Sequence, residues 1–357
     1  MRICYLIDDF SATGGIQRIV PMICSALCDY HEVHVVSMYD EHGDDNRDLY
    51  DERIKFSVLI EGKKDYIRQS FTIANLLKGY LADNGIEVLT ASSEMLTPYC
   101  YLAVKGLDIP FLVWTHTPAL SYDETFLQRP FKFLAAKKAA RIIALTKNTK
   151  KIWKAKYKID SVVAIPNPID PKLMKRRRYA SKSKKIVSVG RICYQKNYEK
   201  LVEVAKIVFD EIKDWSWDIY GDGEDRKTIE ELLEENHLTE RVHLKGNVSN
   251  MYDLYKEYGI QVMTSRFEGF PMTLLEGMAN GLPMLGFDVN GVGEVIKDEV
   301  NGYIIPPFYA DEMAEKIIKL IEDDELRKEF FKNNIKLRDD YSIDKAIDMW
   351  NKMYEEL

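Results

Sequence analysis

The sequence predicts an α/β protein made of two doubly wound domains. Strand-like apolar runs alternate with amphipathic helical patterns along nearly the whole chain, as expected for parallel sheets covered by helices. The chain has 357 residues, more than one hydrophobic core usually serves, so two domains of about 150 to 200 residues each are expected. Prolines and a run of positive charge over residues 167–184 interrupt the apolar pattern, and the boundary between the domains is predicted there.

The predicted strands fall into two groups, one on each side of this boundary. In the first half of the chain the strand-like runs are residues 2–7, 32–38, 55–60, 87–91, 110–116, 141–146 and 161–166. In the second half they are residues 185–190, 215–221, 241–246, 260–265, 282–287 and 302–307. We therefore assign residues 1–170 to an N-terminal domain, 171–183 to a linker and 184–340 to a C-terminal domain, with a cleft expected between the two domains. Residues 341–357 are helical in pattern and are expected to pack back on the N-terminal domain.

The composition is that of a globular protein. Apolar residues make up 46% of the chain, but no window offers the roughly 18 or more uninterrupted apolar residues that a membrane-spanning helix needs. Met1 leads directly into a strand-like run, so no signal peptide is expected. The cysteines form no C-x-x-C pair and have no histidines at zinc spacing; they are Cys4, Cys24, Cys28, Cys100 and Cys193. Reduced thiols in a cytoplasmic protein are the favoured interpretation.

Positive charge is concentrated in one segment. The net charge is −7, yet residues 129–185 contain 19 Lys or Arg against only Asp160 and Asp170. The local balance is +17, and the remainder of the chain therefore carries −24. This asymmetry favours an anionic partner, and the mixture of lysines with aromatic and apolar residues in 129–143 favours a membrane surface over nucleic acid, for which no motif is present. The alternative is a set of solvated helix faces and a linker.

Residues able to bind a ligand follow several predicted strands, where open parallel sheets bind their ligands. Gly14 and Gly15 open a helix after the first strand; backbone there can approach a phosphate, although such a pair is more often only a turn. Arg191 and Lys196 follow the first strand of the second half and can hold one diphosphate if the turn between them folds back. His116 ends a predicted central strand, where it serves either a substrate hydroxyl or the structure.

Two glutamates, Glu268 and Glu276, lie on either side of a turn and a helix start. The helix is expected to begin near Pro271, because the missing N–H of proline suits the first turn. Spacing alone is not informative, since Glu203 and Glu211 have the same offset within an ordinary amphipathic helix. Eight helical residues would span about 12 Å, so these two acids are expected to meet different ends of one ligand.

Backbone amides between these glutamates are expected to bind an anion. The amides of Met272, Thr273 and Leu274 belong to the first helical turn, where the helix dipole and the free N–H groups attract phosphate. A nucleotide sugar has the matching order of sugar hydroxyls, diphosphate and ribose hydroxyls. Carboxylates accept hydrogen bonds from the hydroxyls, and amides suit the phosphates between them.

Taken together, the motifs resemble those of the retaining glycosyltransferases of glycosyltransferase family 4. The resemblance rests on "GGIQRI", "IPNPID", "VGRICYQKN", "YGDGE", "EGFPMTLLEGMANGLP" and "GVGEVI", which occur in the family's order and spacing. It implies the GT-B fold, in which two Rossmann-like domains face each other across a cleft, with the acceptor bound by the N-terminal domain (1–170) and the nucleotide sugar by the C-terminal domain (184–340). It also implies a metal-independent hexosyltransferase whose nucleotide-sugar donor is a co-substrate, with no cofactor besides.

The resemblance implies a role for each matching residue. Arg191 and Lys196 would bind the donor diphosphate and Glu276 would hold the ribose, while Glu268 and His116 would meet the donor sugar. The catalytic set is accordingly Glu268, His116, Arg191 and Lys196. The rest of the donor site, including a base-binding loop at Asn247 and Val248, would be Gly14, Gly15, Asn247, Val248, Gly269, Phe270, Pro271, Met272, Thr273 and Leu274.

The mechanism that the resemblance implies retains the anomeric configuration. The acceptor hydroxyl would attack the face from which the diphosphate departs, and a phosphate oxygen would act as the base. Arg191, Lys196 and the helix start near Thr273 would stabilise the charge on the leaving group. A glycosidase-like use of Glu268 and Glu276 is disfavoured. The two carboxylates of a glycosidase must flank one bond at about 5 to 9.5 Å, whereas Glu268 and Glu276 are expected to contact opposite ends of the donor.

The implied function is transfer of a hexose or N-acetylhexosamine from a UDP-sugar to a hydroxyl of a growing, lipid-linked cell-envelope glycan, such as a capsular polysaccharide, exopolysaccharide or O-antigen. The expected partners are a nucleotide sugar, a saccharide acceptor and an anionic membrane bound through residues 129–185 at the cytoplasmic face, with no nucleic acid. A nucleotide-sugar epimerase of the same architecture is one alternative, and a non-catalytic partner subunit is another. The sequence leaves the sugar, base and acceptor open.

Overall fold

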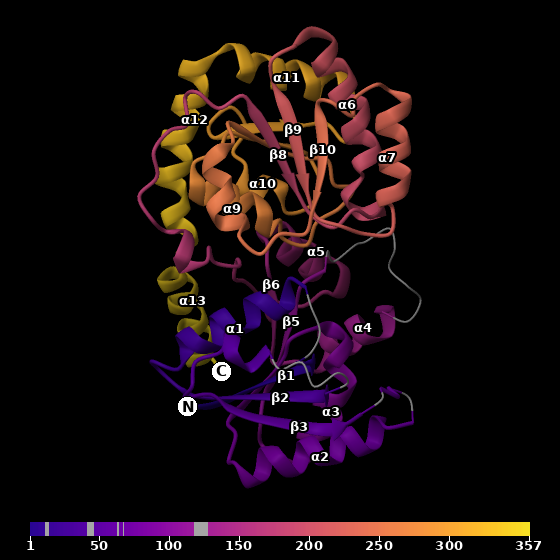
Figure 1. Ribbon diagram of the computed structural model, residues 1–357. Coiled ribbons are helices and arrows are strands. Elements are labelled where there is room, and N and C mark those ends of the chain that lie inside the picture. The colour runs from indigo at the N-terminus through magenta and orange to yellow at the C-terminus, as the bar shows by residue number, and fades with distance from the viewer. Residues whose placement is uncertain (11–13, 41–45, 63, 67, 118–127) are drawn as a thin grey trace. The chain divides into compact units, whose positions relative to one another are not determined.

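The chain folds into two compact units, each with its own parallel sheet. The computed structural model describes residues 1–10, 14–40, 46–62, 64–66, 68–117 and 128–357 (Figure 1). Unit 1 comprises Met1–Asn167 and Ile343–Leu357, and unit 2 comprises Pro168–Ser342. The sequence-predicted linker, 171–183, therefore lies inside unit 2, and the first segment of unit 1 ends at Asn167, three residues before the predicted domain end at 170.

The sheet of unit 1 is entirely parallel and has the strand order β3-β2-β1-β4-β5-β6-β7. Its strands are β1 (Arg2–Asp9), β2 (Glu32–Asp40), β3 (Lys55–Glu61), β4 (Val88–Ala91), β5 (Phe111–Thr115), β6 (Arg141–Ala144) and β7 (Val162–Ala164). The order reverses between β1 and β4, so the crevice beyond their carboxyl ends is where this type of sheet binds ligands.

Helices cover both faces of this sheet. They are α1 (Ile16–Leu27), α2 (Ser70–Asp83), α3 (Thr97–Val104), α4 (Gln128–Lys138), α5 (Lys147–Tyr157) and α13 (Ile343–Glu355). Successive residues of a strand face opposite sides, and β1 shows this alternation. Cys4 and Leu6 enter the core shared with α2, α3, α4 and α5, whereas Tyr5 faces α13.

Unit 2 repeats the design with the strand order β10-β9-β8-β11-β12-β13, again all parallel. Its strands are β8 (Lys185–Val189), β9 (Ser216–Tyr220), β10 (Val242–Gly246), β11 (Ile260–Met263), β12 (Met284–Phe287) and β13 (Gly302–Ile305). Each strand-like run of the sequence overlaps one of the strands of the two sheets, so the predicted α/β class with two doubly wound, Rossmann-like domains is confirmed.

The helices of unit 2 also lie on both faces of its sheet (Figure 1). They are α6 (Tyr198–Glu211), α7 (Arg226–Glu235), α8 (Met251–Leu254), α9 (Met272–Asn280), α10 (Val292–Val295), α11 (Ala310–Glu322) and α12 (Asp324–Leu337). The larger core packs α6, α7 and α11 against one face, around the fully buried Trp217. A second, tyrosine-rich cluster on the other face contains Tyr220, Tyr255 and Tyr258.

The last helix, α13, packs within unit 1 through a buried aromatic cluster. Its buried side chains recur at helical spacing, as in an amphipathic helix that covers a core; they are Ala346, Ile347, Trp350, Met353 and Tyr354. The Tyr354 and Tyr5 hydroxyl oxygens are 2.8 Å apart. The ring centroid of Trp350 lies 5.0 Å from that of Trp114 and 5.9 Å from that of Tyr5. The chain therefore returns to its first sheet after completing unit 2.

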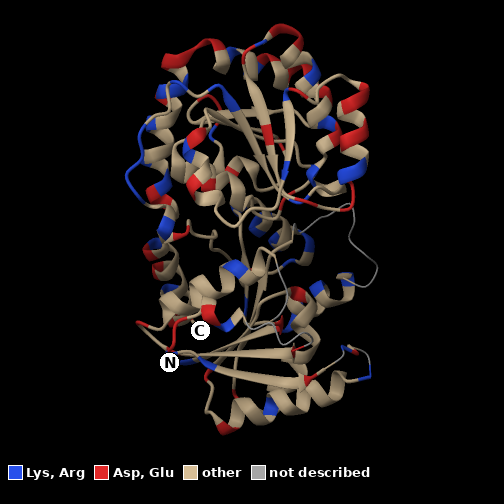
Figure 2. Ribbon diagram, in the orientation of Figure 1, with Lys and Arg blue, Asp and Glu red and all other residues tan. Residues whose placement is uncertain are grey.

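The basic segment 129–185 is divided between the units. In unit 1 the lysines and arginines lie along α4 and α5 (Figure 2), with Arg141 in β6 and Lys158 directly after α5; those from Lys172 to Lys185 belong to unit 2 and end at the first residue of β8. One lysine of the segment, Lys132, is fully buried within α4 and cannot belong to a solvated helix face. No helix among the described residues is long and apolar enough to cross a membrane.

Replacing Trp350 by alanine tests the attachment of α13. Trp350 is buried between Trp114 and Tyr5, so the cavity left behind should lower the free energy of unfolding by about 3 to 5 kcal/mol. Met349, its 39% exposed neighbour on the same helix, is the matched control, and Met349→Ala should cost within about 0.5 kcal/mol. Urea unfolding measures both, and equal costs for the two variants would contradict the packing described.

Candidate active site

The loop after β8 is held by close contact with the loop after β9. The Gly190 N–H donates to the Tyr220 carbonyl at 2.9 Å, and the Ile192 N–H donates to the Asp222 carbonyl at 3.0 Å. A Cβ added at Gly221 would lie 1.9 Å from the Gly190 oxygen, and one at Gly223 would lie 2.2 Å from the Ile192 oxygen. Only glycine permits this approach, which explains the sequence "YGDGE" and fixes the backbone that carries Arg191.

The turn between Arg191 and Lys196 does fold back. Residues Tyr194–Lys196 form a 3-10 turn that leads into α6, and the Lys196 side chain passes Gly190, whose added Cβ would lie 3.1 Å from Lys196 Cε. The Lys196 side chain is 18% exposed. Arg191 instead extends into solvent and pairs with Glu224, with both its Nε and a terminal nitrogen 3.1 Å from Glu224 Oε2. Arg191 can leave this exposed pair for a diphosphate at small cost.

Backbone and side-chain hydrogen bonds tie the loop after β8 to the loop after β11. The Arg266 N–H donates to the Gln195 carbonyl at 2.8 Å, and Gln195 Nε2 donates to the Phe267 carbonyl at 3.1 Å. Thr264 Oγ1 donates to the Lys196 carbonyl at 3.1 Å. These bonds bring Lys196 and Glu268, which are 72 residues apart in the sequence, into direct contact.

Lys196 and Glu268 form an ion pair that is largely removed from water. Lys196 Nζ donates to Glu268 Oε1 at 2.7 Å, and the Glu268 side chain is only 6% exposed. The backbone of Glu268 is also fixed, because Asn290 Nδ2 donates to its carbonyl at 3.0 Å. An ammonium has three N–H groups and a carboxylate about four lone-pair sites, so both partners of the pair retain capacity for a ligand.

The helix α9 begins where the sequence predicts, with Pro271 as its cap and Met272 as its first residue. The expectation that three amides of its first turn face an anion needs correction. The Met272 N–H donates to the Phe270 carbonyl and the Leu274 N–H to the Pro271 carbonyl, both at 3.0 Å, because the first turn closes tightly on the proline. Thr273 Oγ1 is buried and has no hydrogen-bond partner in the described part of the chain, so this hydroxyl is the better candidate for a ligand contact.

Glu276 is buried in the first turns of α9 and is 4% exposed. Tyr255, itself fully buried, donates its hydroxyl to Glu276 Oε2 at 2.8 Å. This bond orients the carboxylate that the sequence assigns to the ribose. Tyr255 precedes the strand β11 and carries no recognisable motif, so sequence reasoning missed it.

The remaining predicted donor residues occupy loops and a helix start. Asn247 and Val248 are exposed in the loop after β10, and Gly14 and Gly15 are exposed directly before α1. Phe270 is buried and its ring lies 6.3 Å from that of Tyr341, so its side chain belongs to the core of unit 2, while Gly269 lies in the turn before it. The donor-binding roles of these residues stay predictions.

His116 follows β5 in unit 1 and stacks on an aromatic cluster. Its ring centroid lies 4.6 Å from that of Trp114, which in turn packs on Trp350 of α13. His116 Nε2 is buried without a hydrogen-bond partner among the described residues. Burial lowers the pKa of His116 to about 3, so the ring is neutral at physiological pH and has a nitrogen available for a substrate hydroxyl.

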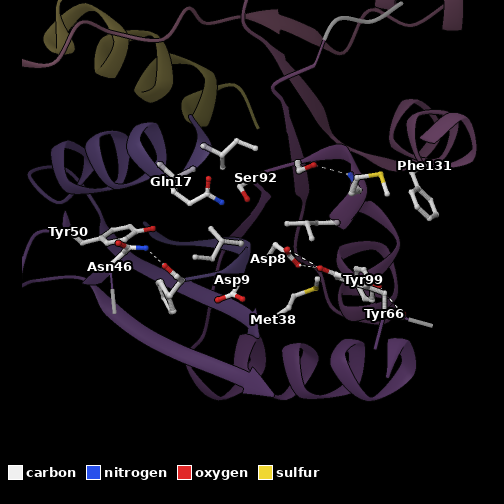
Figure 3. A pocket seen from close by; sticks show the side chains of 17 residues that line it. Asp8, Asp9, Gln17, Met38, Asn46, Tyr50, Tyr66, Ser92, Tyr99 and Phe131 are labelled. Carbon is white, nitrogen blue, oxygen red and sulfur yellow. Dashed lines mark hydrogen bonds between the residues drawn. The ribbon is translucent and has the colours of Figure 1, made fainter. Parts of the chain in front are cut away.

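A cavity of about 680 Å³ opens at the carboxyl ends of β1, β2 and β4 in unit 1 (Figure 3). Aromatic and aliphatic side chains form most of its wall, and the side chains of Asp8 and Asp9 lie along one part of it. Tyr66 donates its hydroxyl to Asp8, 3.0 and 3.1 Å from the two carboxylate oxygens, and Lys64 Nζ lies 2.9 Å from Asp9 Oδ2. Burial raises the pKa of Asp8, and attraction to Lys64 opposes this shift.

Sequence reasoning missed this acidic group. "DD" at the end of the first strand was the available signal, because a strand end at the reversal of the sheet order is where ligands bind. No group of three or more His, Cys, Asp or Glu side chains within the described ranges is arranged as a metal site.

Comparison with known families decides the identity of the fold and activity. The family model "Glycosyltransferase Family 4" matches residues 13–173, and the model "Glycosyl transferases group 1" matches residues 170–337. The chain belongs to glycosyltransferase family 4. It is a glycosyltransferase of the GT-B type, and the resemblance first indicated by its motifs is confirmed.

Several relatives match this glycosyltransferase over its whole length. An uncharacterized glycosyltransferase from Haemophilus influenzae is 25% identical over 354 residues, and the alignment covers 98% of each chain. The amylovoran biosynthesis glycosyltransferase AmsD of Erwinia amylovora is 25% identical over 362 residues, again with 98% of each chain covered. The crystal structure of Anabaena HepE in complex with UDP has a TM-score of 0.85 at 17% identity and covers 100% of both chains, which shows the common fold.

Removing the hydroxyl of Tyr255 tests its role in orienting Glu276. In Tyr255→Phe the carboxylate loses a hydrogen bond worth about 1.5 kcal/mol, so nucleoside diphosphate binding should weaken about tenfold. Calorimetric titration gives the dissociation constant, and Tyr309→Phe, at a 63% exposed position, is the control that should leave it unchanged. Unaltered affinity in Tyr255→Phe would show that the bond does not serve the nucleotide.

Proposed function

We propose that this glycosyltransferase transfers a hexose or N-acetylhexosamine from a UDP-sugar to a hydroxyl of a growing, lipid-linked cell-envelope glycan, with retention of the anomeric configuration and without a metal. The observation that carries the proposal is the largely buried Lys196–Glu268 pair, whose glutamate lies three residues before the proline that caps α9. It joins a cation suited to a diphosphate and a carboxylate suited to sugar hydroxyls within one small volume.

The chemistry follows from the charges in unit 2. As the bond between sugar and diphosphate breaks, negative charge grows on the leaving phosphate, and Lys196 stabilises it because Glu268 already holds the ammonium in place. Arg191 adds a second cation from its exposed pair with Glu224. Two cations of the protein thus take the role that a metal ion has in other transferases, which supports a metal-independent reaction.

His116 is not suited to be the general base that an inverting reaction would need. A histidine whose pKa is about 3 is a poor general base at neutral pH, so it is unsuited to remove the acceptor proton. In our proposal His116 donates or accepts a hydrogen bond at a sugar hydroxyl, and a phosphate oxygen of the leaving group takes the proton. Glu268 positions the sugar and stabilises the developing positive charge on it.

The nucleotide of the donor and the class of the acceptor are supported by relatives. AmsD is named for the biosynthesis of amylovoran, and HepE was crystallised with UDP. The exposed Lys137 and Lys138 at the end of α4, beside the 56% exposed Phe133, support contact with an anionic membrane that presents the acceptor.

A screen of nucleotide sugars tests the function directly. A donor that binds only the folded protein raises its melting temperature, by an amount equivalent to about 2.7 kcal/mol at one hundred times the dissociation constant. We expect a UDP-hexose or UDP-N-acetylhexosamine to stabilise the protein more than GDP- or ADP-sugars, and Arg191→Ala to reduce the shift. Absence of stabilisation by every nucleotide sugar would overturn the proposal, and undiminished donor binding in Arg191→Ala would favour a non-catalytic subunit.

The two glutamates should separate binding from catalysis. Glu276→Gln should weaken nucleotide binding about tenfold, because a neutral amide accepts hydrogen bonds from the ribose less strongly. Glu268→Gln should leave binding nearly unchanged and lower the turnover number about a hundredfold, because it removes charge stabilisation at the sugar. Calorimetry and donor turnover measure the two effects, with Glu203→Gln on the exposed face of α6 as the control. Loss of turnover alone in Glu276→Gln, together with loss of nucleotide binding in Glu268→Gln, would refute these roles.

Charge reversal on α4 tests the membrane contact. The double variant Lys137→Glu and Lys138→Glu should lose most of its binding to vesicles that contain phosphatidylglycerol at low salt, and it should keep its affinity for UDP. The matched control is Lys332→Glu with Lys336→Glu on α12, which changes the net charge equally at two exposed positions. Equal sedimentation of the wild type and of both variants with the vesicles would contradict the assignment to α4.

A further inference from the structure

The side chain of Arg266 joins the loop after β11 to the segment that carries Lys196. Its Nε donates to the Tyr194 carbonyl at 3.1 Å, and its guanidinium carbon lies 4.5 Å from the centre of the Tyr194 ring. A terminal nitrogen of the same guanidinium lies 3.3 Å from Glu199 Oε2. Arg266 therefore contacts the chain on both sides of Lys196, in the 3-10 turn that ends at Lys196 and in the first turn of α6.

The segment between these two contacts changes direction at Asn197. Asn197 has a φ of 55°, in the left-handed region that residues other than glycine seldom occupy, although asparagine tolerates it better than most. Lys196 directly precedes Asn197, so a rotation of the backbone at this point would redirect the Lys196 side chain. The contacts of Arg266 fix the chain before and after this point, and they thereby hold the Lys196 ammonium against Glu268.

The set of contacts requires an arginine. A guanidinium is planar and directs its N–H groups along fixed lines, while its face stacks on an aromatic ring, so it can bind Tyr194 and Glu199 at the same time. The single ammonium of a lysine lacks this fork. The Tyr194 side is open, with the residue 61% exposed, and the Glu199 side chain is 59% exposed, so these contacts lie outside the hydrophobic core and their loss should leave unit 2 folded.

We propose that Arg266 is a positioning residue, which holds Lys196 in place for the phosphate next to the transferred sugar. The inference rests on the proposed function, in which Lys196 binds that phosphate. Arg266 itself does not contact the donor and acts through residues 194–199. The phosphate concerned is the distal one of a nucleoside diphosphate, and a nucleoside monophosphate lacks it. Loss of Arg266 therefore weakens the binding of the diphosphate and spares that of the monophosphate.

Comparison of UDP with UMP isolates the distal phosphate. Calorimetric titration of the full-length protein gives both dissociation constants, and the ratio of the UMP constant to the UDP constant measures what this phosphate adds. Arg266→Met should lower the ratio about tenfold by weakening UDP binding, with UMP binding kept within about twofold. Arg266→Lys keeps the charge without the planar fork, and it should still lower the ratio about fivefold or more. An unchanged ratio in Arg266→Met, or a full ratio in Arg266→Lys, would overturn the proposal.

A double-mutant cycle tests whether Arg266 acts through Lys196. In a protein that already carries Lys196→Met, no ammonium is left to position, so adding Arg266→Met should change the ratio by less than about twofold. An equal loss in both backgrounds would show that Arg266 acts independently of Lys196 and would contradict the proposal. If Arg266→Met does not fold, Glu199→Gln decides, because it removes one contact at an exposed position. A ratio lowered about threefold supports the proposal, and an unchanged ratio overturns it.

Arg241→Met is the matched control. Arg241 is also half-buried and donates to the Trp215 carbonyl at 3.3 Å, but it directly precedes β10 and so lies at the amino-terminal edge of the parallel sheet, opposite the candidate site. Both dissociation constants should be those of the wild type, and equal effects of Arg241→Met and Arg266→Met would overturn the inference. Absence of UDP binding by the wild type would overturn the proposed function itself. Wild-type binding of UDP with an unchanged ratio in Arg266→Met overturns the role of Arg266 alone.

Discussion

The ion pair between Lys196 and Glu268 is the constraint on which the arrangement of the candidate site depends. Its partners come from loops after β8 and β11, neighbouring strands in the sheet of unit 2. The Lys196 side chain is 18% and the Glu268 side chain 6% exposed, so both charges are best satisfied when the two loops keep this one arrangement. The same arrangement presents an ammonium and a carboxylate to a ligand at one point, which a nucleotide sugar can use at the junction of its sugar and its diphosphate.

Glycine and hydrogen bonds build this constraint from below. Gly221 and Gly223 let the loop after β9 approach the loop after β8 so closely that an added Cβ would lie 1.9 or 2.2 Å from a carbonyl oxygen. Hydrogen bonds from Gln195 and Thr264 join the loop after β8 to the loop after β11. A second buried carboxylate contact, from Tyr255 to Glu276, fixes the other acid of the motif. The arrangement of the candidate site thus depends on packing among the ends of three neighbouring strands of one sheet, β9, β8 and β11.

Whether the sequence predicts a feature depends on how far apart along the chain the residues that determine it lie. Strands, the start of α9 and the strand-end position of His116 are set by local periodicity and turn residues, so they could be predicted. The pairing of Arg191 with Glu224, the burial of Lys132 and the local bonds of the Met272 and Leu274 amides depend on geometry that no residue pattern encodes. The acidic cavity depends on Lys64 and Tyr66, more than fifty residues after Asp8, and only the folded sheet brings them together.

The stereochemistry of sugar release is the sharpest test of the proposed mechanism. Water can replace the acceptor hydroxyl, so a UDP-α-sugar incubated with concentrated enzyme and no acceptor should release free sugar slowly. Proton NMR, followed from the first minutes, distinguishes the two anomers before they equilibrate. Because attack is proposed on the face from which the diphosphate departs, we expect the α-anomer to be released first. Initial release of the β-anomer would contradict the retaining mechanism and the roles proposed for Lys196 and Glu268.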